Sequence, residues 1–126
     1  MKAFKVAISL ISFVIIFMVV HGFVIRKLSN EILVILSKIE KCVDEEEWEG
    51  AAKHCDTLEK VFIKKSFWLH MTINSEETRN MEISLYRIKL LAEKKQSENL
   101  YSEIALTKKI FEYLPKKEGF CLMEIL

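Results

Sequence analysis

One run of apolar residues near the start of the chain limits what this sequence can form more than any other feature. Residues 6–25 read VAISLISFVIIFMVVHGFVI and contain no Asp, Glu, Lys or Arg. At about 1.5 Å per residue, a helix over this run is roughly 30 Å long, which is the hydrocarbon thickness of a bilayer. Lysines precede the run, and Arg26 and Lys27 follow it. The sequence therefore predicts a transmembrane helix over residues 6–25, after a short N-terminal tail at residues 1–5.

Two other interpretations of this run are open. Val20-His21-Gly22 is a tolerable cleavage context, so the run could be a signal peptide that is removed. The run continues to Ile25, however, beyond the usual apolar region of about 7–15 residues, which favours an uncleaved signal anchor. A buried core helix is the third interpretation, and an uncharged run of this length is rare in so small a domain.

The rest of the chain has the composition of a solvated helical domain. All 18 acidic residues lie after position 30, where they nearly balance the basic residues, so there is no basic excess of the kind that nucleic-acid binding needs. The chain has only 3 Gly and 1 Pro, and it lacks the Asn-Gly or Asp-Gly pairs of tight hairpins. These features favour helices, and no nucleic-acid partner is expected.

Helical spacing of apolar residues predicts where the helices lie. An apolar stripe with 4-3-4-3 spacing runs from Leu28 to Cys42 through Ile32, Ile35 and Ile39, and Leu36 widens it. This Leu28–Cys42 stripe predicts a juxtamembrane amphipathic helix at residues 26–43, which continues the membrane helix as one rod from about residue 4 to 43. Asp44 and Glu47 have capping-box spacing and predict the start of a second helix. The stripe of that second helix contains Trp48, Ala52, Cys55, Leu58 and Phe62.

Two further helices complete the prediction. Asn74 and Glu77 have capping-box spacing, and they precede a helix with one face made by Met81, Leu85, Ile88 and Ala92. A second apolar face on that helix, which includes Ile83 and Tyr86, predicts that it is the most enclosed of the set. The last helix carries Leu100, Ile104, Thr107, Phe111 and Leu114 and is expected to end at Pro115. The fold class is thus all-α: an N-terminal transmembrane helix continues into an antiparallel bundle of about four helices, with the bundle domain at residues 44–126.

A search for chemistry predicts no catalytic, cofactor-binding or metal-binding residues, and the chain is not expected to be an enzyme. His54, Cys55 and His70 are the only His/Cys group to consider, but neighbouring residues on a helix point about 100° apart. Glu82 and Arg87 either make a buried polar contact or occupy an exposed strip. Cys55 and the two other cysteines show no CxxC spacing, so they are expected to be small buried residues, with one disulfide as the alternative.

Contact with other molecules is the better use of the apolar residues. Trp68 beside the Lys64-Lys65 pair is either an interface or membrane-surface anchor, or a residue that closes the far end of the core. The apolar C-terminal tail either docks a partner or caps its own bundle. The candidate partner interface consists of Leu28, Ile32, Ile35, Ile39, Phe67, Trp68, Phe120 and Leu122.

The order of these segments resembles a known family. The segments are KIEKCVDEEEWEGA, SFWLHMTIN, NMEISLYRIKLL and FEYLP, after one apolar run. They resemble the domain-of-unknown-function family 4363, small single-pass membrane proteins of Gram-positive spore formers. The resemblance covers nearly the whole chain, and the matching positions are Trp48, Ala52, Trp68, His70, Glu82, Leu85 and Pro115.

The resemblance implies an accessory role without known enzymatic activity. Members of that family are often encoded beside a larger multi-pass membrane protein. The resemblance also implies a cytoplasmic N-terminus, with the domain outside the cell. The charges around the apolar run, taken alone, slightly favour the opposite orientation. We therefore expect a membrane-anchored interaction protein, in contact with the lipid bilayer and with a multi-pass partner. The alternative is a self-associating structural component of the cell envelope or spore membrane, paired as a homodimer through the Leu28–Cys42 stripe.

Overall fold

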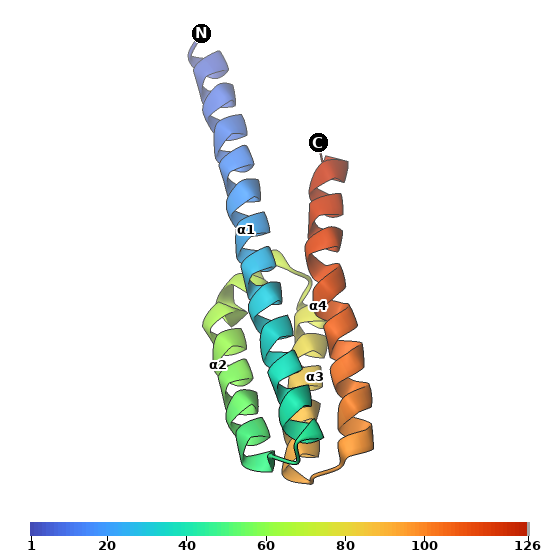
Figure 1. Cartoon of the computed structure of the whole chain (residues 1–126). Coiled ribbons are helices and arrows are strands. Elements are labelled where there is room, and N and C mark those ends of the chain that lie inside the picture. Colours follow the sequence, from blue (N-terminus) through green and yellow to red (C-terminus); the bar gives the residue numbers. More distant parts are fainter. Residues whose placement is uncertain (126) are drawn as a thin grey trace.

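The computed structural model describes residues 1–125, with side chains described as far as Lys117. It contains α1 (Lys2–Asp44), α2 (Trp48–Thr72), α3 (Ser75–Glu93) and α4 (Ser97–Ile125) (Figure 1). Each helix packs against two others: α1 and α3 each contact both α2 and α4. The described part is therefore an antiparallel four-helix bundle, as predicted, and α1 is also one of its four members.

The helix α1 has two halves with different surroundings. Its N-terminal half projects beyond the bundle (Figure 1), and apolar side chains such as Phe13 and Val19 are exposed there. Its C-terminal half, from His21 to Val43, contributes buried residues to the core. Within the described residues, α1 is the one helix that is long and apolar enough to cross a membrane. The predicted continuous rod is confirmed, because no break separates the apolar run from the core stripe.

The core is built from the stripes that the helical spacing predicts. The predicted face of α3 that contains Met81 and Leu85, and the predicted face of α4, are buried in full. On α2 the pattern is shifted at its start, because Ala51 is buried and Ala52 is exposed. The central buried residues are Leu28, Ile32, Ile39, Leu58, Leu69, Ile88, Leu100, Ile104 and Phe111.

The predicted capping box at the start of α2 is wrong. Asp44 is the last residue of α1, and α2 begins at Trp48 without a side-chain cap. Glu46 adopts a left-handed conformation with φ of 56°, and the Glu47 N–H donates to the carbonyl of Cys42 at 2.8 Å. These are the features of a Schellman motif, which ends α1 where the sequence pattern suggests a helix start.

The connection before α3 follows the sequence more closely. Asn74 is the N-cap residue of α3, and its side chain accepts a hydrogen bond from the Glu76 N–H at 2.9 Å. Glu77 does not complete a capping box in the described contacts, because its carboxylate pairs with Lys117 of α4. This ion pair joins the N-terminal end of α3 to the C-terminal part of α4.

Two further predictions need correction. Pro115 does not end the last helix, since α4 continues to Ile125. A proline removes one helical hydrogen bond and crowds the preceding turn, but the helix can continue when residues on both sides favour it. The prediction that the third helix is the most enclosed is also wrong, because Ile83 and Tyr86 on α3 are exposed to solvent.

Candidate interaction surfaces

An aromatic junction joins the apolar half of α1 to the end of α2. We use this name for Phe17, His21 and Trp68. The Trp68 indole Nε1–H donates to His21 Nδ1 at 3.1 Å, and the ring centroids of Phe17 and Trp68 lie 5.5 Å apart. His21 is only 3% exposed. Because an indole N–H can only donate, this bond requires an unprotonated Nδ1 on His21.

Local structure holds Trp68 at this place. The hydroxyl of Thr72 donates to the Trp68 carbonyl at 2.6 Å, in the last turn of α2. Ile73 is extended and ends the helix, and Asn74 then caps α3. The turn that carries Trp68 is therefore fixed against α1 from one side and by the α2–α3 connection from the other.

An apolar stripe on α2 lies beside the aromatic junction. Ile63, Phe67 and Met71 follow a spacing of four residues and are 59%, 77% and 65% exposed. Residues four apart lie on one face of a helix. Lys64 and Lys65 flank this stripe, and neither takes part in an ion pair within the described residues. We call these three apolar residues the α2 stripe.

A groove between α2 and α3 is the second candidate surface, with a cavity volume of about 450 Å³. Its lining includes the buried residues Cys55, Phe62 and Leu85 and the exposed residues Ile63, Ile83 and Tyr86. Apolar side chains therefore provide both its inner part and its rim.

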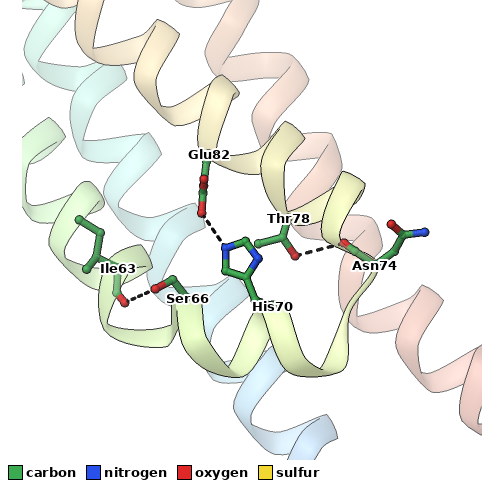
Figure 2. A network of polar contacts seen from close by, with 6 residues as sticks. All are labelled: Ile63, Ser66, His70, Asn74, Thr78 and Glu82. Carbon is green, nitrogen blue, oxygen red and sulfur yellow. Dashed lines mark hydrogen bonds and ion pairs between the residues drawn. The ribbon is translucent and has the colours of Figure 1, made fainter.

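Polar contacts bridge the two walls of this groove. His70 Nε2 and Glu82 Oε1 lie 3.1 Å apart, and Lys89 Nζ donates to Glu59 Oε2 at 3.2 Å. Figure 2 shows His70 of α2 reaching the Glu82 carboxylate on α3. Glu82 and Arg87 are both exposed, as the second of the two predicted alternatives has it, and Glu82 contacts His70.

The groove has a neutral inner part and a charged rim. Burial raises the pKa of Cys55 to about 12, so its thiol is protonated at neutral pH. The hydrogen bond from Lys89 to Glu59 raises the pKa of Lys89, so its ammonium stays charged. A groove of this kind suits apolar side chains with polar groups at their edges, and a protonated, buried thiol is a poor nucleophile.

The structure divides the predicted interface residues into three groups. The four residues on α1, namely Leu28, Ile32, Ile35 and Ile39, are buried in the chain's own core, so the interface prediction for them is wrong. They are buried because α2 and α4 pack against that face of α1. Phe67 is exposed and Trp68 is half-buried against α1. Phe120 and Leu122 lie outside the residues whose side chains are described.

Several residues of these surfaces were not predicted. The spacing of Ile63, Phe67 and Met71 was a usable signal, since it repeats every four residues on a helix. The pairing of His21 with Trp68 had no such signal, because 47 positions separate the two residues. No group of three or more potential metal ligands gathers among the described residues. His54, Cys55 and His70 in particular differ in burial, and His70 contacts Glu82.

Comparison with known proteins places the chain in a family. The family model described as a domain of unknown function, DUF4363, matches residues 19–125, from the last part of the apolar run to the end of α4. The match therefore includes His21, Trp68 and the whole bundle. No curated protein and no solved structure matches the chain. Because the match covers most of the sequence, the chain belongs to the DUF4363 family.

Proposed function

We propose that this chain is a single-pass membrane protein whose helical bundle is an accessory module for a multi-pass membrane protein. The observation that carries the proposal is the continuity of α1, which passes from an exposed apolar half directly into the core. A helix shared in this way holds the bundle at a fixed height and orientation beside the bilayer. A partner in the same membrane then meets a surface that is already oriented.

The α2–α3 groove is the docking place that we propose for this partner. α2 packs against the C-terminal half of α1, and α3 packs against α2 with its axis in the same general direction (Figure 1), so the groove extends in the direction in which α1 leaves the membrane. A helix or loop that emerges from a neighbouring membrane protein would approach it from the side. Ile83 and Tyr86 would then bury apolar surface, and the ion pairs at the rim would stay near water.

Site-specific photocrosslinking in native membranes tests this docking. A photoreactive amino acid at Ile83 or Tyr86 is expected to give one adduct with a multi-pass protein, identified by mass spectrometry. The same group at Ser102, an exposed position on α4, is the matched control and is expected to give none. An adduct between two copies of the chain would instead favour the self-associating envelope component. Equal adducts from all three positions would contradict docking in the groove.

We also propose that the N-terminus is cytoplasmic and that the bundle lies outside the cell, as the family resemblance favours. Cys42 is half-buried and Cys55 is buried, so Cys42 is the better reporter. In a Cys121→Ser background, a membrane-impermeant maleimide is expected to label Cys42 in intact cells, while Lys2→Cys is protected until the cells are opened. The reverse pattern would place the bundle inside.

A further inference from the structure

The end of the bundle nearest the apolar half of α1 exposes large apolar side chains, which are unfavourable in water. This end contains the last turns of α2, the α2–α3 connection and the aromatic junction (Figure 1). We propose that it is seated in the interface of the bilayer that α1 crosses, with the α2 stripe facing lipid and nearby basic side chains facing anionic headgroups. This inference rests on the proposed function only in requiring that α1 is a membrane anchor.

Trp68 lies beside the apolar run of α1. Trp68 contacts Phe17 and His21, which lie within the uncharged run and precede its first following charge, Arg26, by five to nine residues. At about 1.5 Å per residue, this places Trp68 roughly 8–13 Å beyond Arg26, toward the membrane. The end of α2 must therefore reach the boundary of the bilayer when α1 spans it. Tryptophan is enriched at that boundary, where one side of its ring is apolar and the other is polar.

Apolar side chains next to Trp68 on α2 are exposed. Phe67 and Met71 are among the most exposed large apolar residues outside the N-terminal half of α1. Both lie within one turn of Trp68, on the same helix. Phe67 and Met71 form a lipid-facing surface of the kind that interfacial helices use, and Ile63 continues their row to the edge of the α2–α3 groove. The occupant is thus the membrane itself, which α1 already brings to this end.

Exposed basic side chains lie at this end of the bundle. Arg26, Lys27 and Lys64 are exposed near this end, and none of them belongs to an ion pair within the described residues. The opposite end of the bundle carries Glu45, Glu46 and Glu47 between α1 and α2, which outnumber Lys94 and Lys95 between α3 and α4. Basic residues beside an interfacial helix attract anionic lipid headgroups, whereas the acidic end is repelled by them. The charges therefore favour the same orientation as the apolar surface.

The two tryptophans of the chain provide a matched test. Trp48 and Trp68 stand at opposite ends of α2, about 30 Å apart for twenty helical residues. The full chain is reconstituted into vesicles of phosphatidylcholine and phosphatidylglycerol that carry brominated acyl chains. Trp48→Phe leaves Trp68 as the only tryptophan, and Trp68→Phe leaves Trp48. We expect brominated lipid to quench Trp68 emission at least severalfold more than Trp48 emission, and iodide in the water to show the opposite order.

A second pair of variants covers the case in which Trp68→Phe disturbs the fold. In a background without native cysteines, a spin label at Met71→Cys is expected to be accessible to oxygen and protected from a water-soluble nickel complex. A label at Ala52→Cys, an exposed position near the other end of α2, is expected to show the reverse. Equal accessibility at the two positions, or a Trp68 that is quenched no more than Trp48, would overturn the proposed contact of this end with the bilayer interface.

The outcome also separates this inference from the proposed anchor. A chain that fails to float with the vesicles contradicts the anchor. A chain that floats with Trp68 unquenched contradicts the contact of this end with the bilayer interface, and it remains consistent with α1 as a membrane anchor. Burial of Trp68 in native membranes but not in pure lipid vesicles would assign the α2 stripe to a protein partner and overturn the inference.

Discussion

Two helices in this bundle end at a residue that has a left-handed backbone conformation although it is not glycine. Glu46 has φ of 56° and Lys95 has φ of 55°. Each is the C′ residue of a Schellman motif, since the Lys95 N–H bonds to the Ala92 carbonyl and the next N–H bonds to that of Leu91. A side chain with a Cβ pays about 1–2 kcal/mol in this conformation, whereas glycine adopts it without that cost.

We therefore expect Lys95→Gly to stabilise the fold. The strain that glycine relieves in the left-handed conformation is larger than the free-energy cost of its extra entropy in the unfolded chain. The free energy of unfolding should therefore rise by roughly 0.5–1 kcal/mol. The adjacent Lys94→Gly is the control, because Lys94 has an ordinary φ of −84° and should lose stability. Chemical unfolding of the full chain in detergent, followed by circular dichroism, measures both changes. A loss of stability in Lys95→Gly would contradict the assigned turn.

Cys55 predicts how stability depends on alkaline pH. Burial raises the pKa of its thiol from 9.0 to about 12, so above pH 9 the unfolded thiol loses its proton before the folded thiol does. The unfolded state then binds fewer protons, and the free energy of unfolding falls as pH rises, by at most about 1.4 kcal/mol per pH unit. The raised pKa values of Tyr101 and Lys89 act in the same direction.

The variant Cys55→Ala isolates this contribution. Alanine removes the thiol, so the free energy of unfolding of the variant should fall less than that of the parent chain as pH rises from 9 toward about 12. The measurement is the free energy of unfolding of both chains in detergent at several pH values. A difference between the two chains that does not change with pH would contradict the burial of Cys55.

At the scale of the helices, α4 makes a clear prediction because it continues through Pro115. Proline leaves the carbonyl of Phe111 without its helical hydrogen bond and costs up to about 3 kcal/mol within a helix. Pro115→Ala should therefore raise the free energy of unfolding by roughly 1–3 kcal/mol. Ala105→Pro, at an exposed position of the same helix, should lower it by a similar amount. A helix content that falls in Pro115→Ala would show that the proline is needed to shape α4.

The helices differ in how far their sequences determine them. The stripes of α3 and α4 were predictable because one repeat of apolar residues corresponds to one buried face. The start of α2 was not, because Asp44 and the glutamates after it fit a capping box as well as they fit a helix end closed by Glu46. The local pattern is the same in both cases, and packing of α1 against α2 decides between them. Gly50 is part of that packing, since a Cβ there would lie 3.2 Å from Cys42 Sγ.

The candidate surfaces were predictable only in part, for a related reason. The stripe on α1 looked like an interface because a sequence does not show which apolar face its own helices will cover. Phe67 is exposed because its side chain lies on the outer face of α2, whereas its neighbour Trp68 contacts α1. The contact between His21 and Trp68 depends on the register of α1 against α2, which no local pattern records.

At the scale of the whole molecule, α1 makes the apolar run and the bundle one unit. Its C-terminal half supplies part of the core and is tied to α4 by the Lys108–Glu40 ion pair at 3.0 Å and by a hydrogen bond from Tyr101 to Asp44. Removal of the residues before Phe23 would take Phe17 and His21 from the aromatic junction and leave the indole N–H of Trp68 without this acceptor. The fold therefore favours a chain that keeps its apolar run.

The intact mass of the chain recovered from its native membrane tests this account most directly. The chain carries a C-terminal tag, the membranes are washed with alkaline carbonate, and the tagged species is purified in mild detergent. If α1 is an uncleaved membrane anchor, the tagged chain stays in the membrane pellet and retains the residues before Gly22. Recovery in the wash, or a mass that corresponds to a chain starting after Gly22, would contradict it.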